Sequence, residues 1–302
     1  MVLALWLVLL GLNCLSAGSH RRYKRVIGGR KAATPISGAP IVSVFKEDHE
    51  ATVTGTKEDE YLAFRGIRFA EPPVGNYRFQ RARKLRLEGD VSATVPGAPC
   101  PQPDPVRADR VVGSEDCLFL NVFTKQLPDS PEDPGQLPVM VWIHGGGFRR
   151  GSASQYGPGP LVNKGLVVVT IQYRLGSIGF LSAANKELPG NAGMFDMTLA
   201  LDWVQDYISF FGGDPARVTL CGQGSGASSA ILLSLSNLTK EGEAGWRRTN
   251  KRREVSSAMV GETVTLGTIE SVEKLPHKEP ETTLVKLRPC SLLAWQQSRA
   301  GR

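Results

Sequence analysis

Two continuous apolar runs rich in valine and isoleucine constrain the fold of this chain most. They are Val139–Ile143 and Leu166–Gln172, and neither alternates between apolar and polar side chains. A strand that is apolar at nearly every position is buried on both faces, which is typical of a parallel sheet covered by helices. The sequence therefore predicts an α/β fold.

The segment beyond Asn191 predicts a helix of the kind that such a sheet needs. Its apolar side chains recur at helical spacing and form one stripe: Ala200, Trp203, Val204, Tyr207, Ile208 and Phe211. Gly212 and Gly213 end this helix, strand Arg217–Cys221 follows, and a second helix is expected from about Ala227. This alternation of strands and helices is typical of an open, mostly parallel, doubly wound sheet.

Short alternating segments precede the parallel part. They are Ile41–Phe45, Ala51–Thr54 and Tyr61–Phe69, and charged or glycine-containing turns separate them. This pattern predicts a small antiparallel sheet that leads into the parallel one.

The N-terminus indicates export from the cell. Met1–Leu10 is an apolar run too short to span a bilayer, and small residues follow at Ser16, Ala17 and Gly18. We interpret residues 1–18 as a signal peptide, with a buried N-terminal strand as the alternative. No later segment has enough uninterrupted apolar residues for a membrane anchor. The expected localisation is secreted and extracellular.

Residues 19–40 form a basic leader. Cleavage after Arg25 would release Val26–Gly29 (VIGG), which resembles the activated N-terminus of a trypsin-like protease. That hypothesis fails, because the chain has no Ala-His-Cys segment and no Gly-Asp-Ser-Gly-Gly nucleophile loop. A mobile leader is the remaining interpretation.

The net charge of +7 is dispersed over the chain. Basic residues cluster only at Arg21–Arg25 and Arg247–Arg253, both in polar segments, so we expect no nucleic-acid partner. No cluster of residues has metal-ligand spacing, and we expect neither a metal nor a cofactor.

The cysteines are informative in an oxidising compartment. Cys100 and Cys117 flank a proline-containing stretch and are candidate disulfide partners, whose bridge would stabilise the fold by about 3 kcal/mol. Cys221 lies in an apolar strand and is expected to pack as a small hydrophobic side chain. Asn237 begins the one glycosylation sequon, Asn-Leu-Thr.

A glycine triplet follows the first buried strand, within Trp142–Phe148 (WIHGGGF). Three glycines let the backbone approach a ligand and direct several N–H groups at one point, as an oxyanion hole for acyl transfer requires. A glycine triplet alone is more often a flexible turn. With the His and Phe flanks after an apolar strand, it indicates a site.

Five motifs together resemble the type-B carboxylesterase/cholinesterase family in order and spacing. They are Phe64–Gly75 (FRGIRFAEPPVG), Ser114–Asn121 (SEDCLFLN), His144–Phe148 (HGGGF), Asn191–Met194 (NAGM) and Phe211–Pro215 (FGGDP). The resemblance covers residues 41–238. It implies the N-terminal part of an α/β-hydrolase fold, a Cys100–Cys117 bridge, and oxyanion-hole amides at Gly146 and Gly147.

The resemblance also implies a nucleophile elbow, Gly-x-Ser-x-Gly, directly after the strand that ends at Cys221. The segment reads Gly222–Gly226 (GQGSG), so that Gly224 occupies the nucleophile position and no acyl-enzyme can form there. Ser225 lies one residue further along, where the family uses the backbone amide as a third oxyanion donor. Gln223 replaces the usual Glu, which removes a charge that would support a catalytic imidazolium.

The catalytic His and acid of the family are also not found. The four histidines are His20, His49, His144 and His277, and none stands in the C-terminal position from which the family's base comes. Beyond Leu238 no family motif follows. Residues 239–302 have scattered charges and prolines without sustained periodicity, and we expect a disordered tail.

Three functional hypotheses follow. The first is a secreted, non-catalytic protein with an extracellular protein partner, since the chain resembles cholinesterase-like adhesion proteins such as neuroligins, glutactin and gliotactin. The second is a carboxylic ester hydrolase, active on a small-molecule ester through Ser225 or in a longer isoform. The third is a truncated product without independent function.

Overall fold

The structure is a computed structural model of the 302-residue chain. It describes residues 38–46, 49–107, 109–129 and 137–236, together with three strands further on at 256–259, 265–274 and 283–290. The predicted signal peptide, nearly all of the basic leader and Asn237 lie outside the described residues.

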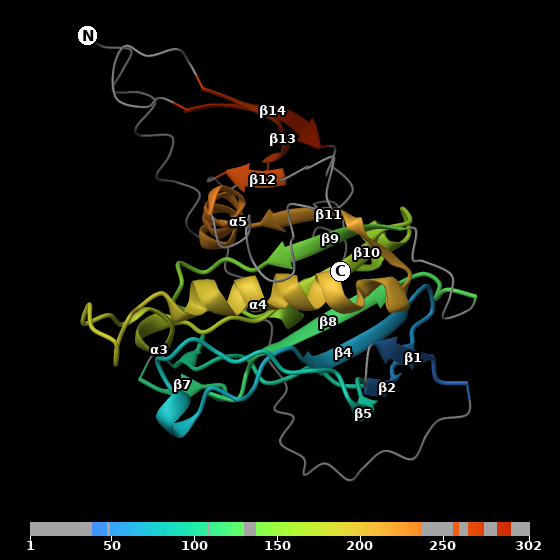
Figure 1. Cartoon of the computed structure of the whole chain (residues 1–302), viewed down its shortest axis with the longest axis horizontal. Helices are drawn as coiled ribbons and strands as arrows, with labels where there is room; N and C mark the ends of the chain where they lie inside the picture. The colour runs from blue at the N-terminus through green and yellow to red at the C-terminus, as the bar shows by residue number, and fades with distance from the viewer. Residues whose placement is uncertain are drawn as a thin grey trace. The chain divides into compact units, whose positions relative to one another are not determined.

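A six-stranded mixed sheet forms the centre of the fold (Figure 1). Its strand order is β11-β9-β10-β8-β4-β3. The strands are β3 (Thr56–Lys57), β4 (Leu62–Arg68), β8 (Phe119–Thr124), β9 (Leu137–Ile143), β10 (Val167–Ile171) and β11 (Gly213–Gly222). Strands β9, β10 and β11 run parallel to one another, and β3, β4 and β8 pair in antiparallel fashion.

The two apolar runs form adjacent parallel strands, as predicted. Every residue of β10 is buried, and Val169 pairs with Val141 of β9. Alternate side chains of these strands enter different clusters: Val141 and Val169 pack into the main core, and Met140 and Val168 pack on the other face. Burial of both faces explains the lack of alternation in the sequence.

Helix α4 (Ala192–Tyr207) covers one face of the sheet (Figure 1). Its buried stripe contains Ala200, Trp203 and Val204, which belong to the main core. A 3₁₀ turn, η3 (Ile208–Phe211), extends the helix, and Gly212 ends it with a φ of 86°. This left-handed conformation favours glycine, so the predicted helix end is confirmed.

The remaining helical elements are short except for one. They are η1 (Gly75–Tyr77), η2 (Ala153–Gln155), α2 (Gly159–Val162), α3 (Gly176–Phe180) and α5 (Ser225–Leu235). Helix α5 begins two residues before the predicted start at Ala227. Among the described residues, no helix combines the length and apolar character needed to cross a membrane.

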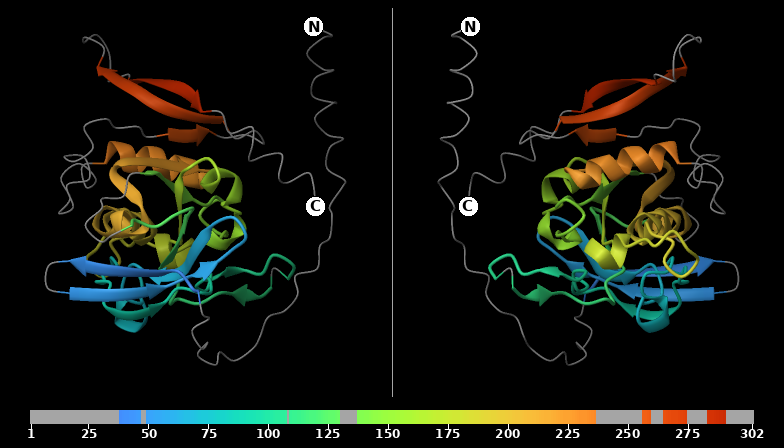
Figure 2. Two further views of the ribbon diagram at one scale, coloured as in Figure 1. Left: turned by 90° about the vertical axis from the view of Figure 1, so that its right-hand side faces the viewer. Right: turned by 90° about the vertical axis from the view of Figure 1, so that its left-hand side faces the viewer.

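The predicted small sheet forms from β1 (Ile41–Lys46), β2 (His49–Thr54) and β5 (Gly89–Ser92) (Figure 2). The β1–β2 pair is antiparallel, whereas β5 runs parallel to β2. Val42 and Val44 of β1 are buried, and the intervening side chains are exposed. Tyr61–Phe69 belongs to the central sheet instead, because β4 pairs with β8 over its length.

The Cys100–Cys117 disulfide is present, and both cysteines are fully buried. It closes a loop that contains the short antiparallel pair β6 (Gln102–Pro103) and β7 (Val111–Val112). Cys221 is a buried free cysteine packed beside Met140 and Trp142, as expected of a small hydrophobic side chain.

Three strands lie within the segment that the sequence analysis predicts to be disordered. They are β12 (Ser256–Met259), β13 (Thr265–Lys274) and β14 (Thr283–Cys290), and they form an antiparallel sheet. The prediction of disorder is corrected at these strands. Backbone hydrogen bonds between neighbouring strands stabilise them, and such pairing does not require the local alternation on which the prediction depended.

Candidate functional site

A sharp turn joins the end of β11 to the start of α5. A Cβ atom added to Gly222 would lie 2.4 Å from the carbonyl carbon of Gly226. A Cβ atom added to Gly226 would lie 2.1 Å from the carbonyl oxygen of Ile143. Both positions therefore exclude any larger residue, and the turn is a closed elbow with Gly224 at its centre.

Gly224 forms the tip of this elbow. Its φ of 54° and ψ of −120° lie in a region that side-chain-bearing residues rarely adopt. The residue is exposed, and a Cβ atom placed on it would meet nothing within 4 Å. The tip therefore has a backbone conformation that glycine adopts without strain, and it leaves free space where a side chain would stand.

The glycine loop packs against the elbow. A Cβ atom on Gly145 would lie 2.4 Å from the carbonyl oxygen of Gln223, so the two backbones are in direct contact. Gly146 and Gly147 follow with φ values of 117° and 62°. A Cβ atom on Gly146 would lie 2.1 Å from the Arg150 carbonyl oxygen. Only glycine fits this close turn, which places the predicted oxyanion-hole residues beside Gly224.

Ser225 contacts the glycine loop rather than the tip of the elbow. Its Oγ accepts a hydrogen bond from the backbone N–H of Phe148 at 3.3 Å, and its hydroxyl also bonds to Tyr173. Burial raises the pKa of Tyr173 above its ordinary value, so this phenol stays protonated. It donates to the carbonyl oxygen of His144 at 2.8 Å. Ser225 thus contributes to a structural network.

His144 is a structural residue of the same network. Its ring stacks on Tyr173 with centroids 4.4 Å apart, and Nδ1 lies 3.0 Å from the carbonyl oxygen of Gly145. The imidazole is fully buried, and this burial lowers its pKa to about 4. The neutral, buried ring packs between Tyr173 and the glycine loop and so helps to order that loop.

Gln102 anchors the far end of the glycine loop. Its side-chain amide donates to the carbonyl oxygen of Gly151 at 2.8 Å and accepts from the N–H of Gly151 at 2.8 Å. The same side chain donates to the carbonyl oxygen of Cys100 at 3.0 Å. The disulfide-closed loop is therefore hydrogen-bonded directly to the loop that carries Gly146 and Gly147.

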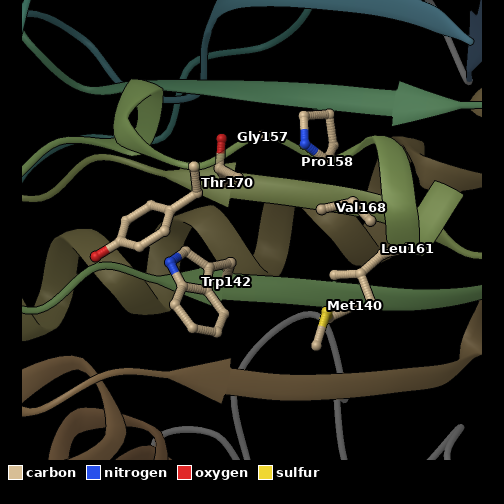
Figure 3. Close-up of a pocket in the computed structure, with 8 residues that line it drawn as sticks. Met140, Trp142, Gly157, Pro158, Leu161, Val168 and Thr170 are labelled. Carbon is tan, nitrogen blue, oxygen red and sulfur yellow. The ribbon is translucent and has the colours of Figure 1, made fainter. Parts of the chain in front are cut away.

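An apolar pocket lies close to the elbow (Figure 3). Side chains of β9 and β10 form its floor, and the segment from Tyr156 to Leu161 covers it: Met140, Trp142, Val168, Thr170, Tyr156, Gly157, Pro158 and Leu161. Tyr156 packs on Trp142 with ring centroids 5.0 Å apart and donates to Gln223 Oε1 at 3.1 Å. This hydrogen bond connects the pocket to the elbow.

A strand–turn–helix elbow beside a glycine loop is the arrangement expected from the family resemblance in the sequence. The sequence profile of the carboxylesterase family matches residues 47–245. This chain belongs to the carboxylesterase family. The α/β-hydrolase fold predicted from the resemblance is confirmed, and it places the family's elbow and glycine loop at adjacent strand ends.

Curated carboxylesterases are similar at about two-fifths identity. Esterase FE4 of Myzus persicae is 40% identical over 211 residues, which cover 68% of this chain and 37% of that protein. Para-nitrobenzyl esterase of Bacillus subtilis is 43% identical over 194 residues, covering 61% of this chain and 39% of that protein. The chain thus spans well under half the length of the carboxylesterases it matches.

A solved structure shows the same similarity. Juvenile hormone esterase from Manduca sexta, crystallised with OTFP covalently attached, aligns with a TM-score of 0.57 at 38% identity. The alignment covers 65% of this chain and 38% of that structure.

Within this carboxylesterase-family chain, the loop that carries Gly146 and Gly147 contacts the elbow that carries Gly224 and Ser225, through Gly145 and Phe148. Asn237 lies outside the described residues. Sequence reasoning missed the contributions of Gln102, Tyr156 and Tyr173, which no motif signals. Over the described ranges, no group of His, Cys, Asp and Glu side chains could hold a metal ion.

Proposed function

We propose that this chain is a secreted carboxylesterase-fold protein that does not hydrolyse esters and binds an extracellular protein partner. One observation carries the proposal. Gly224 occupies the tip of the elbow, where ester hydrolysis by an acyl-enzyme requires an oxygen or sulfur nucleophile.

The surroundings of Gly224 support loss of chemistry with retention of the fold. Gly222 and Gly226 are sterically required, and the backbone at the tip keeps the sharp turn of the elbow. The space above Gly224 is open, so packing does not explain the glycine. A fold that is kept without its nucleophile is consistent with a binding role, in which the surface acts and not the reaction centre.

Secretion is supported by the predicted signal peptide and by the Cys100–Cys117 disulfide. Disulfides persist mainly in oxidising compartments. Expression in a secretory cell line, followed by N-terminal sequencing of the medium fraction, should give a chain that begins close to Ser19. Retention inside the cell with Met1 intact would contradict this part.

The alternative is ester hydrolysis through Ser225. The observation that favours it is the position of Ser225 beside the glycine loop. Against it, Ser225 Oγ accepts from Phe148, and the shifted elbow would place Gln223 and Ala227 where close backbone contact demands glycine.

Turnover of a short-chain nitrophenyl ester separates the two functions. The secreted chain, its Ser225→Ala variant and para-nitrobenzyl esterase as a positive control are assayed together with stoichiometric labelling by a fluorophosphonate. The proposal expects neither turnover nor labelling by the chain. Turnover that disappears in Ser225→Ala would establish the hydrolase instead.

Circular dichroism with a thermal melt tests the third hypothesis. A cooperative transition is expected of a chain with an independent role, and it would be followed by a screen against cell-surface proteins. A chain without a transition, which binds a hydrophobic dye from the start, would be a truncated product.

A further inference from the structure

A basic segment crosses the surface beside α4 and contacts that helix at Phe195 and Asp206. The segment runs from Arg78 to Arg86 (RFQRARKLR), and five of its nine residues are basic and exposed: Arg78, Arg81, Arg83, Lys84 and Arg86. The expectation that basic residues cluster only at Arg21–Arg25 and Arg247–Arg253 is therefore corrected. A dense run of Lys and Arg is typical of a surface that binds a polyanion.

Carboxylates neutralise part of this charge. Arg78 Nε donates to Glu115 Oε2 at 2.6 Å. Lys84 Nζ lies 2.7 Å from Asp206 Oδ2, and the charge of Asp202 also attracts this ammonium group. The charges of Arg78 and Lys84 are therefore balanced within the protein, and the excess positive charge lies between them.

Arg81 and Arg83 contact aromatic rings instead of carboxylates. Arg81 Cζ lies 3.7 Å from the centroid of the Phe195 ring, and Arg83 Cζ lies 4.2 Å from that of the Tyr77 ring. In the part of the chain that the structure describes, neither arginine forms an ion pair, although the backbone N–H of Glu71 donates to the carbonyl oxygen of Arg83 at 2.9 Å. An aromatic face orders a guanidinium group without neutralising its charge.

The backbone places both guanidinium groups on one side of the segment. Ala82 lies between the two arginines and packs against the main core, and Lys84 pairs with Ala70 in an antiparallel bridge. In an extended segment, side chains two residues apart project to the same side, at a spacing of about 7 Å. Arg81 and Arg83 are both exposed and therefore face solvent together. We call them the arginine pair.

We propose that the arginine pair binds a sulfated polysaccharide chain of the extracellular space. A planar guanidinium donates two parallel hydrogen bonds to the oxygens of one anionic group, and a linear polyanion presents such groups in succession to both arginines. Phe195 and Tyr77 each have a ring face occupied by an arginine, which favours a ligand without bases to stack. The choice of an extracellular polyanion rests on the secretion part of the proposed function.

Affinity of the full secreted chain for immobilised heparin, measured by surface plasmon resonance over a series of salt concentrations, tests the proposal. We expect binding at about 0.15 M salt. In Arg81→Gln/Arg83→Gln the affinity should fall at least about 10-fold, and the slope of its logarithm against that of the salt concentration should fall by about 2, because two fewer cations displace counterions.

The matched control is Lys164→Gln/Arg217→Gln. It removes the same charge from two exposed positions on other elements, after α2 and on β11, and it should leave the affinity nearly unchanged. The basic clusters Arg21–Arg25 and Arg247–Arg253 are the same in all three proteins, so the difference between the variants reports on the arginine pair alone.

A further variant guards against a loss that only reflects misfolding. Arg81→Lys/Arg83→Lys keeps both charges without the planar guanidinium groups, and its affinity should lie between those of the wild type and the glutamine variant. Hyaluronan, which carries no sulfate, should compete weakly with heparin.

Four results would overturn the proposal: no binding to heparin, an equal loss of affinity in the control variant, equal competition by hyaluronan, or tighter binding to single-stranded DNA or to vesicles that contain phosphatidylserine. These measurements use the purified chain and do not depend on ester turnover. Retention of the chain inside the cell would contradict the secretion proposal and would leave the heparin affinity measurable, so the two failures are distinguishable.

Discussion

Gly226 and Ile143 are in backbone contact, because a Cβ atom at Gly226 would lie 2.1 Å from the Ile143 carbonyl oxygen. This contact fixes the start of α5 against the end of β9. A Cβ atom added to Gly224, two residues away, would meet no atom within 4 Å. The two glycines of one elbow thus have different physical reasons for their identity.

Substitution of these glycines should distinguish steric exclusion at Gly226 from the backbone conformation at Gly224. Gly226→Ala forces a main-chain shift and should lower the free energy of unfolding by about 3 kcal/mol. Gly224→Ala adds only the strain of a side chain on a backbone with φ 54° and ψ −120°, and it should cost about 1 kcal/mol. Urea denaturation of the two variants measures both. Equal losses would show that the elbow is not closed around Gly226.

Stability should fall as the pH drops from about 6.5 to about 4 because of His144. Burial lowers the pKa of the native imidazole to about 4, whereas the unfolded chain binds a proton near pH 6.5. The unfolded state therefore binds more protons in this window and stability rises with pH, by about 3 kcal/mol over the window. Urea denaturation at several pH values measures this slope. A His144→Gln variant should show a flatter profile, and an unchanged profile would contradict the assignment.

The ion pair between Arg174 and Asp196 is fully buried. Arg174 Nε donates to Asp196 Oδ2 at 2.8 Å, and Nη2 donates to Oδ1 at 2.7 Å. Arg174→Met should destabilise the fold by about 3–5 kcal/mol, because the carboxylate remains buried without its cation. Thermal or chemical denaturation measures the loss.

The exposed pair of Arg217 with Asp214 provides the matched control for that substitution. Arg217→Met should change stability by less than about 1 kcal/mol, because water screens this pair. Similar losses in the two variants would show that burial does not determine the contribution of Arg174.

Removal of the disulfide should lower stability by about 3 kcal/mol. Cys100 and Cys117 are separated by 17 residues, a loop length for which the bridge restricts the unfolded chain by about this amount. In a Cys100→Ala/Cys117→Ala variant the denaturation midpoint should fall and become insensitive to reductant. A wild-type midpoint that reductant leaves unchanged under unfolding conditions would contradict the assignment.

Local patterns predicted much of the fold. Val139–Ile143 is uniformly apolar and forms part of strand β9, as predicted. The helical stripe that ends at Phe211 also lies in a helical segment, as predicted. The tail was predicted less well, because β13 pairs with strands on both sides and needs no strong periodicity of its own. Pairing between distant segments is not visible in a local window.

At the candidate site, too, some features were predicted from the sequence and others became visible only in the structure. Motif spacing predicted that Gly224 occupies the nucleophile position, and the structure places this residue at the tip of the elbow. The anchoring of Gly151 by Gln102 joins residues 49 positions apart, and the bond from Phe148 to Ser225 joins residues 77 positions apart. Neither contact has a sequence signal.

The sequence by itself determined the family, the order of strands and helices, the paired cysteines and the glycine at the tip of the elbow, because each depends on residue type at short spacing. Only the tertiary structure decided that Gly145 contacts Gln223 and that the backbone N–H of Phe148 donates to Ser225 Oγ. Those relationships arise when strands far apart in the chain align in one sheet and bring their ends to a common boundary.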